Sequence, residues 1–242
     1  PTFRKLDFDK DGRIWTNSSR YKAGMFCLDI NNTLDNNNDD KHKFVGPTFT
    51  NQDGVSEIIN DIFFFEFDKN GEMWLGTDRG IFVLREPEKF LSSDKVIFER
   101  VKIPRNDGTN LADYLLSGIY TTAICIDDAN RKWIGTQNNG VFLLSEDGKE
   151  TIHHFTEENS PLLSNYIQTI AINSSTGSVF FGTSLGLIEY GGDATEPEKS
   201  LSESNIEVYP NPVNPDFDGP VTIKGMSDKC TVRIVSASGS LI

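Results

Sequence analysis

The sequence predicts an all-β protein, and three features support this prediction. Short runs rich in aromatic and β-branched residues recur along the chain, separated by turns that contain Gly, Asn and Asp. Four segments repeat one pattern of three strands around a central aromatic residue. Repeats that each hold several strands are typical of β-propellers, with one repeat per blade. We therefore predict a partial β-propeller of about four blades, followed by an incomplete small antiparallel β-sandwich.

The best-formed copy of the repeat is Asp61–Arg85. Its first strand is rich in aromatic residues, and the glycine of the following turn can adopt a positive φ angle. The predicted order is strand Ile62–Phe67, turn Asp68–Gly71, strand Met73–Leu75, turn Gly76–Gly80 and strand Ile81–Leu84. This copy sets the register against which the other three are aligned.

The central aromatic residues are spaced by 59, 59 and 47 residues, and they are Trp15, Trp74, Trp133 and Phe180. Three residues before each one lies Gly12, Gly71, Asn130 or Gly177, all of which tolerate a left-handed turn. Gly-Thr follows the aromatic residue in three copies, whereas the first copy has Asn17-Ser18. Because these features keep in step, we interpret the segments as blades instead of unrelated hairpins. We interpret the aromatic residues as blade packing instead of ligand platforms.

The first repeat, Phe3–Leu28, is predicted to begin with Lys5–Phe8 as a strand. Its turn, Asp7–Gly12, has the D-x-D-x-D-G spacing of the first half of an EF-hand calcium loop. Such a loop needs a bidentate Glu at its twelfth position, where this chain has Ser18. We therefore interpret the turn as a hairpin turn, with calcium binding as the alternative.

Alternating residues predict an outer strand for each of the first three blades: Lys43–Phe49, Lys95–Ile103 and Glu150–Phe155. Asn31–His42, rich in Asn and Asp, predicts a surface loop. The last outer strand carries His153 and His154. Neighbouring residues of a strand point to opposite faces, so this pair is poorly placed to chelate one metal ion.

The last two blades complete residues 1–190 as the propeller domain. The third is predicted from Leu115–Ile126, Lys132–Thr136 and Gly140–Leu144, and the fourth from Tyr166–Ile172, Ser178–Gly182 and Gly186–Tyr190. The fourth has no outer strand of its own. Propellers commonly close by pairing a strand from one chain end with the blade at the other end. We therefore expect the donor strand for the fourth blade, and further blades, upstream of Pro1.

Two further segments follow the blades. Residues 191–204 are polar, contain a Gly pair and a Glu-Pro-Glu-Lys run, and predict a linker. Residues 205–242 alternate as three short strands with a Pro210-Asn211-Pro212 bend, which predicts the opening of a small antiparallel sandwich. We expect this sandwich to be truncated, because three strands rarely close one.

Composition narrows the classes of function. The 242-residue chain has a net charge of −13, which argues against binding nucleic acid through phosphate neutralisation. No apolar run approaches the ~18–20 residues of a membrane span. Three distant cysteines, Cys27, Cys125 and Cys230, are predicted to be structural instead of paired. No signal peptide is recognisable, and we attribute this to a trimmed N-terminus instead of a cytoplasmic location.

Two resemblances rest on these residues. The repeats F-D-K-N-G-E-M-W-L-G-T-D-R-G-I and N-R-K-W-I-G-T-Q-N-N-G-V resemble the two-component-regulator propeller repeat of periplasmic sensor domains in Bacteroidetes. The tail V-Y-P-N-P-V resembles the C-terminal sorting domain of the type IX secretion system, with its opening motif at Tyr209, Pro210, Asn211 and Pro212 and a later turn at Gly239. Propeller repeats followed by such a tail are similar to surface components of the type IX machinery.

That resemblance implies a non-enzymatic surface component that helps deliver anionic lipopolysaccharide to the sortase-like enzyme that processes secreted cargo. The expected location is the cell surface or outer membrane, with no nucleic acid, cofactor or metal. Alternatives are a secreted surface-attached protein that binds glycan or protein, with the tail as a sorting signal, and the periplasmic sensor domain of a hybrid two-component regulator. A propeller lyase or glycosidase is a further alternative, although no residue pair in the sequence nominates a mechanism.

Candidate ligand contacts lie in the loops that follow the central strand of each blade: Thr77–Gly80, Thr136–Gly140 and Thr183–Gly186. Equivalent loops gather on one face of a propeller, where ligands commonly bind. The predicted contact residues are Asp78, Arg79, Gln137, Asn138, Asn139 and Ser184.

Overall fold

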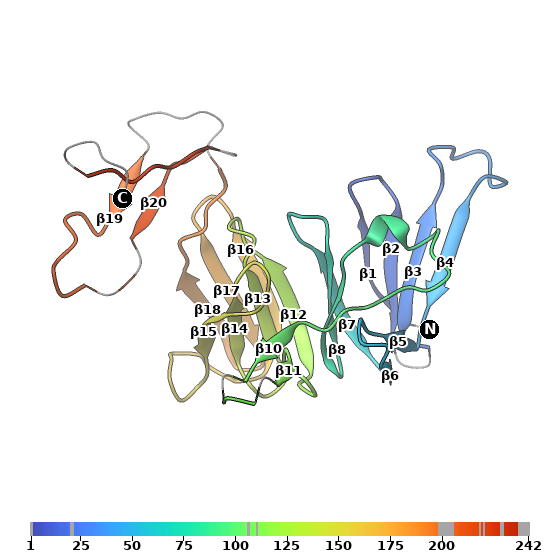
Figure 1. Cartoon of the computed structure of the whole chain (residues 1–242), viewed down its shortest axis with the longest axis horizontal. Coiled ribbons are helices and arrows are strands. Elements are labelled where there is room, and N and C mark those ends of the chain that lie inside the picture. The colour runs from blue at the N-terminus through green and yellow to red at the C-terminus, as the bar shows by residue number, and fades with distance from the viewer. Residues whose placement is uncertain are drawn as a thin grey trace.

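The computed structural model of the chain describes residues 2–19, 22–105, 107–109, 111–197, 206–217, 219, 221–227 and 230–236. These residues form an all-β protein made of several antiparallel sheets and one short 3₁₀ turn, η1 (Pro87–Lys89). Four sheets follow one another in chain order, from the blue end to the orange end of Figure 1. The predicted all-β fold with successive blades is confirmed.

The first blade is a four-stranded sheet in chain order. Its strands are β1 (Thr2–Phe8), β2 (Ile14–Ser19), β3 (Gly24–Asp29) and β4 (Lys41–Val45). β1 begins earlier than the predicted start at Lys5, because Thr2 and Phe3 pair with Ser19 and Ser18. The predicted outer strand Lys43–Phe49 was wrong in its bounds: Gly46-Pro47 interrupts it, since proline has no N–H for the ladder.

The second blade contains β7 (Ile62–Phe67), β8 (Met73–Thr77) and β9 (Gly80–Leu84). All three predicted strands are confirmed. The predicted turn Gly76–Gly80 is shorter than expected, because Gly76 and Thr77 still pair in β8 and Gly80 opens β9. The turn itself is Asp78-Arg79.

The predicted outer strand Lys95–Ile103 of this blade was wrong. Glu99 exchanges two backbone hydrogen bonds with Val83 of β9, whereas Phe98 donates to Thr50 on the other side. The segment therefore lies between the sheet of β9 and the strand that contains Thr50, and it pairs with each through one isolated bridge. Arg100 follows, with its side chain in the interior, where it is 1% exposed.

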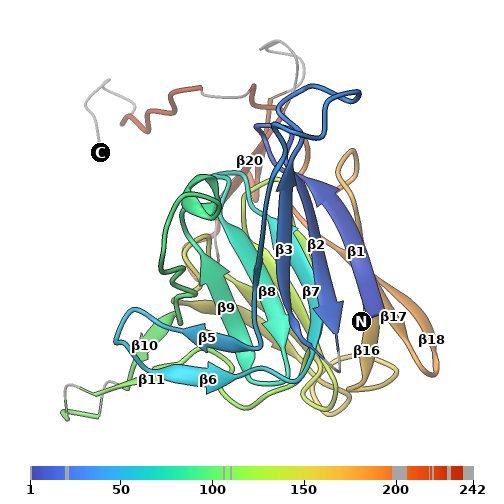
Figure 2. The same ribbon diagram turned by 90° about the vertical axis from the view of Figure 1, so that its right-hand side faces the viewer.

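Two hairpins cover the outer edge of the second blade. They are β5–β6 (Thr48–Thr50 and Ser56–Ile58) and β10–β11 (Lys102–Pro104 and Ala112–Tyr114), seen together at the lower left of Figure 2. Tyr114 donates its hydroxyl to Asp53, 2.8 Å away, and Lys102 lies 2.7 Å from the same carboxylate. The hydrogen bonds from Lys102 and Tyr114 hold the pKa of Asp53 below its usual range.

The third and fourth blades follow the predicted order closely. The third consists of β12 (Thr121–Ile126), β13 (Lys132–Thr136), β14 (Val141–Leu144) and β15 (Thr151–Phe155), and the fourth of β16 (Ile167–Asn173), β17 (Ser178–Thr183) and β18 (Gly186–Gly191). Among the described residues no fourth strand pairs with β18. His153 and His154 lie in β15, where the imidazole of His154 stacks on Phe142 at 3.9 Å.

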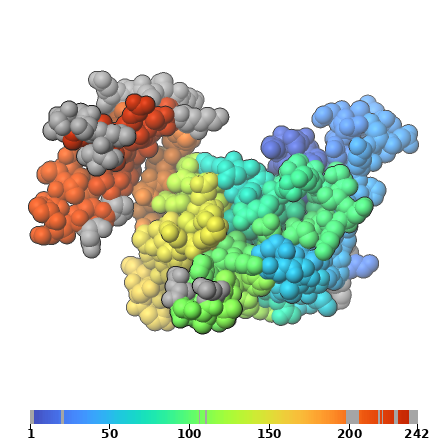
Figure 3. All heavy atoms as spheres, in the orientation of Figure 1, coloured from blue at the N-terminus to red at the C-terminus, as the bar shows by residue number. Residues whose placement is uncertain are grey.

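The tail contains β19 (Glu207–Tyr209) paired with β20 (Thr222–Lys224), and forms a lobe beside the blades (orange and red in Figure 3). The third predicted strand is wrong over the described residues 230–236, which make no regular ladder. Val232, Ile234 and Val235 are exposed there, so no apolar partner fixes them as a strand. Residues 192–197 of the predicted linker pack on the fourth blade, where the Glu196 N–H donates to Ser174.

Each of the first three blades packs its central tryptophan onto the next blade. Trp15 lies in one cluster with Phe65, Leu75 and Phe82 of the second blade. Trp74 packs with Ile124 and Ile134 of the third, and Trp133 with Ile170 and Phe181 of the fourth. All three indoles are fully buried, as predicted for blade packing. Phe180 is only half-buried, because the described residues place no further blade on its face.

An aspartate at each hairpin turn holds the tryptophan of the same blade. Asp68 accepts hydrogen bonds from two backbone N–H groups of its own turn and from the Trp74 indole N–H at 3.3 Å. Asp9 and Asp127 make the same bonds to Trp15 and Trp133. In the fourth blade Asn173 stands in place of the aspartate, and Phe180 stands in place of the tryptophan. The hydrogen-bond acceptor and the indole donor are therefore replaced together. The D-x-D-x-D-G string is thus a hairpin turn whose Asp9 carboxylate binds Arg13 and Trp15.

The glycine of the Gly-Thr pair lets the next blade approach closely. A Cβ on Gly135 would lie 2.6 Å from Cγ2 of Ile167, the first residue of β16. In the first repeat Asn17 occupies this position, and its amide instead reaches the Ile62 carbonyl of the second blade at 2.8 Å. The missing glycine of the first repeat is therefore replaced by a hydrogen bond between blades.

We expect Gly135→Ala to destabilise the chain by about 1–3 kcal/mol, because the added methyl group overpacks a blade interface. Gly191→Ala is the matched control, since its Cβ would meet nothing within 4 Å. Chemical denaturation of both variants checks this. Equal midpoints for the two would show that the blades yield at Ile167 and that close approach is not required.

The three cysteines are free thiols in the described structure. Cys27 is buried and Cys125 and Cys230 are half-buried, and none forms a disulfide. Burial raises the pKa of the Cys27 thiol to about 12 and that of Cys125 to about 11. Both side chains therefore pack as protonated, apolar groups.

Candidate functional site

All four first strands contain a bulge at the same level, and this bulge builds the candidate site. Phe63 lies unpaired between Ile62, which faces Thr77, and Phe64, which faces Gly76. Thr122 and Gln168 occupy the same place in β12 and β16. In β1 the register shift lies between Phe3 and Leu6 and so covers Arg4 and Lys5. Arg4 is the equivalent of Phe63. Because first strands of neighbouring blades lie side by side, the bulge residues form a row along this edge.

Two exposed tyrosines extend the row. Tyr120 lies one residue before β12 and Tyr166 one residue before β16, at equivalent positions. Their side chains are 46% and 40% exposed, in contrast to the fully buried tryptophans. We define the inner arc by Arg4, Phe63, Tyr120, Thr122, Tyr166 and Gln168.

Direct contacts connect the inner arc from blade to blade. The Arg4 guanidinium lies over the Phe63 ring at 5.2 Å, and the Phe63 and Tyr120 ring centroids are 5.9 Å apart. Thr122 donates its hydroxyl to the carbonyl of Ile167, which joins the third blade to the fourth. Arg4 also lies 3.6 Å from a carboxylate oxygen of Asp61, an atom that is buried and has no hydrogen-bond partner among the described residues.

The predicted contact residues lie on the neighbouring loops and divide into two groups. Asp78 is 5% exposed and accepts hydrogen bonds from the Asn60 and Asp61 backbones, so its carboxylate is occupied within the loop. Arg79 is half-exposed beside it. The exposed group is Gln137, Asn138, Asn139 and Ser184.

One of these loops touches the inner arc directly. The Gln137 N–H donates to the Tyr120 carbonyl at 3.0 Å, and the Asn139 carbonyl contacts His154 at 2.7 Å. The loop Thr136–Gly140 is therefore held against Tyr120 on one side and the outer strand on the other. Its exposed amides and the arc's aromatic rings belong to one continuous surface.

The residues of the inner arc were not predicted from the sequence. A bulge adds one residue to a strand without a marker such as Gly or Pro, and Ile62–Phe65 is apolar throughout. The detectable signal is the break in alternation, in which Ile62 and Phe65 are buried with two half-exposed residues between them. The same break occurs at Ile167 and Ile170.

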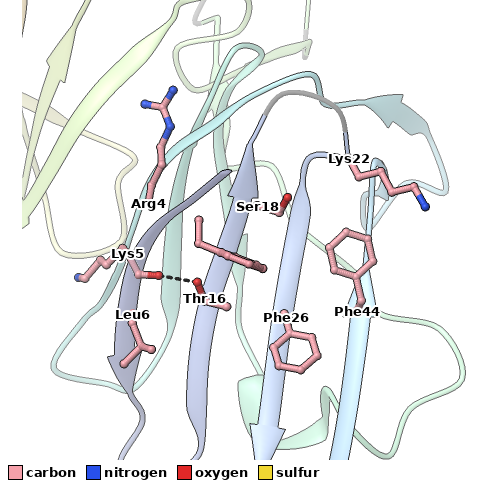
Figure 4. Close-up of a pocket in the computed structure, with 9 residues that line it drawn as sticks. Arg4, Lys5, Leu6, Thr16, Ser18, Lys22, Phe26 and Phe44 are labelled. Carbon is pink, nitrogen blue, oxygen red and sulfur yellow. Dashed lines mark hydrogen bonds between the residues drawn. The ribbon is translucent and has the colours of Figure 1, made fainter. Parts of the chain in front are cut away.

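A cavity of about 630 Å³ lies elsewhere, on the open face of the first blade (Figure 4). Its floor is a row of residues opposite one another in β1 to β4: Leu6, Thr16, Phe26 and Phe44. Arg4 and Lys5 line its edge, but both side chains point away from it in Figure 4, and Lys5 binds Glu66 at 2.6 Å. The groove is therefore apolar.

The position of Leu6 in this row is buried in every other blade. Leu6 is 63% exposed, whereas its equivalents Phe65, Ile124 and Ile170 are at most 8% exposed. Each equivalent is covered by the tryptophan of the preceding blade. The groove thus has the composition and position of a surface that receives a blade, and the inner arc is the better candidate for binding a soluble ligand.

Two general features of the site remain. Among the described residues no group of three or more His, Cys, Asp or Glu side chains is placed to hold a metal ion. The part of the chain that the structure describes contains no helix long and apolar enough to cross a membrane.

Successive antiparallel sheets, each packed on the next through one aromatic residue, define the chain as a set of propeller blades. The chain is similar to PorZ, an essential surface component of the type IX secretion system of Porphyromonas gingivalis. The two share 32% identity with a TM-score of 0.75 over 99% of this chain. The chain is thus a PorZ-like propeller, and it spans 32% of the length of the PorZ chain.

A second solved structure shows the same fold. The extracellular domain of the BT4673 one-component system of B. thetaiotaomicron is 16% identical with a TM-score of 0.51, over 85% of this chain and 28% of that one. No family model matches the sequence, and no curated protein matches it.

Proposed function

We propose that the chain is part of a non-enzymatic component of a type IX secretion system, exported to the cell surface or outer membrane. We propose further that this component binds anionic lipopolysaccharide and delivers it to the sortase-like enzyme. The observation that carries the proposal is the 32% identity with PorZ across 99% of the chain. The Y-P-N-P motif in its place after the blades adds support.

The placement of that motif is compatible with recognition by a partner. Tyr209 is 38% exposed at the end of β19, and the Lys224 ammonium lies 5.2 Å from its ring centroid. Pro210, Asn211 and Pro212 follow as an exposed or half-buried bend. Gly239, the later turn of the motif, lies outside the described residues.

The four blades are proposed to belong to a larger propeller. The groove of the first blade supports this, because the equivalents of Leu6 in the other three blades are covered. The half-exposed Phe180, at the tryptophan position of the last blade, supports it from the other side. A further blade on the groove would bury Leu6, Phe26 and Phe44.

The test uses the full-length protein purified from its own bacterium. We expect it to bind immobilised lipopolysaccharide and to co-purify with the sortase-like enzyme after mild cross-linking. Deleting the gene should leave secreted cargo unprocessed in the periplasm. Normal cargo processing in the deletion strain, with no affinity for lipopolysaccharide, would refute the proposal.

The exposed bend at Tyr209 also supports a second candidate function, in which the tail is a sorting signal and the propeller is a secreted surface-attached binding protein. This candidate predicts cleavage within residues 191–204 during export. Mass spectrometry of the cell-surface protein distinguishes the two. An intact tail favours the secretion-system component, and a C-terminus within that segment favours the secreted binding protein.

A further inference from the structure

We propose that the inner arc is a saccharide-binding surface that contacts pyranose rings of a glycan. The inference rests on the proposed function, since lipopolysaccharide carries a glycan, and it assigns the sugar contact to particular residues. The feature that carries it is the bulge that four successive first strands repeat at one level, with the exposed rings of Tyr120 and Tyr166 beside it.

The aromatic rings supply the stacking face. A pyranose presents a patch of C–H groups on one side of its ring, and this patch packs well on the face of an aromatic side chain. Tyr120 and Tyr166 have exposed rings, and Phe63 holds Tyr120 from the side at 5.9 Å. In the described structure neither tyrosine hydroxyl has a hydrogen-bond partner, so both are available to sugar hydroxyl groups.

The polar members supply directional contacts. Gln168 is exposed in the bulge of β16, and the amides of Gln137 and Asn138 are exposed beside Tyr120. An amide both donates and accepts, which matches the dual character of a sugar hydroxyl group. Arg4 adds a cation at the end of the row, where it would favour an acidic substituent.

Packing does not account for these residues. The aromatic residues that join the blades, Trp15, Trp74 and Trp133, are fully buried, whereas the arc tyrosines keep more than a third of their surface in water. The bulge itself adds a residue that the ladder does not need, and bulges recur next to binding sites because they redirect a side chain. A repeated bulge that presents a different side chain in each blade, polar in three of the four, fits recognition of an extended chain.

The experiment measures binding of the full-length protein to two probes: whole lipopolysaccharide of its own bacterium, and the polysaccharide freed from that lipopolysaccharide by mild acid. Tyr120→Ala should weaken binding of the freed polysaccharide about fivefold to tenfold, the effect of losing one stacked ring. Tyr120→Ala with Tyr166→Ala should weaken it further, whereas Tyr120→Phe should retain most of the affinity. Phe217→Ala, 41% exposed in the tail, is the matched control.

The outcomes separate the inference from the proposed function. Loss in the Tyr120 and Tyr166 variants, with native melting temperatures and an unaffected control, supports the arc. Wild-type protein that binds lipopolysaccharide but not the freed polysaccharide overturns the arc and leaves the proposed function standing. Unchanged affinity in the double variant has the same meaning. Wild-type protein that binds neither probe overturns both.

Discussion

Replacing Trp74 with alanine is expected to lower the free energy of unfolding by about 3–5 kcal/mol, the usual range for truncating a buried tryptophan. The indole is fully buried and packs on Ile124 and Ile134 of the third blade. Its loss therefore opens a cavity inside the second blade and removes the contact that joins the second blade to the third. It also removes one of the two donors to Oδ2 of Asp68, and the Lys132 ammonium remains as the other.

Trp74→Phe serves as the graded control, because it keeps an aromatic ring and loses only the indole N–H and some volume. The fourth blade already has this arrangement, with Phe180 and Asn173 in place of Trp and Asp. We expect the phenylalanine variant to lose much less stability than the alanine variant, as measured by urea denaturation. Equal losses in the two would mean that the hydrogen bond to Asp68, and not the packing, is the main contribution.

The blades could be predicted from sequence because each repeat combines several local signals. Turn residue, aromatic residue and Gly-Thr lie at fixed distances, and each has its own physical reason in the structure. Gly71 adopts a φ angle of 81°, and Trp74 packs on the next blade. Gly135 lets β16, the first strand of the fourth blade, approach closely. Local chemistry and tertiary packing agree at these positions, so the pattern is readable.

The outer edge could not be predicted in the same way. Lys95–Ile103 alternates like a strand, yet it pairs on one side with β9 of its own blade and on the other with the earlier hairpin strand β5. Its conformation is set by Thr50 and Val83 together, and alternation alone does not reveal two competing partners. The predicted tail strand around Val232 differs in another way, since its apolar side chains are exposed over the described residues.

The candidate site shows the same division. The loops after each central strand could be located from the repeat, and Gln137 does lie against the inner arc. The arc itself depends on bulges, which change the face that a side chain occupies without changing the composition of the strand. Asp78 shows that loop position alone does not identify a ligand contact. Its place after the central strand made it a candidate, whereas its carboxylate accepts hydrogen bonds from the backbone of residues 60 and 61.

The second large effect is expected at Lys132, which is fully buried between the second and third blades. Its ammonium has three acceptors: Asp68 at 3.0 Å, the Asn130 carbonyl at 2.8 Å and the Glu146 carbonyl at 2.6 Å. These match its three donors, and the Trp74 ring lies 4.8 Å away. We expect Lys132→Met to cost about 3–5 kcal/mol, because it leaves the Asp68 carboxylate buried without its counter-charge.

A double-mutant cycle separates that electrostatic penalty from simple loss of packing. Equivalent positions in the other blades are Ile14, Met73 and Val179, so a methionine fits the space by the chain's own precedent. Asp68→Asn combined with Lys132→Met removes both charges, and the double variant should be more stable than the sum of the two single losses by at least about 1 kcal/mol. Additive losses would show that the two charges do not interact across the blade interface, and that Asp68 depends only on the N–H groups of its own turn and on Trp74.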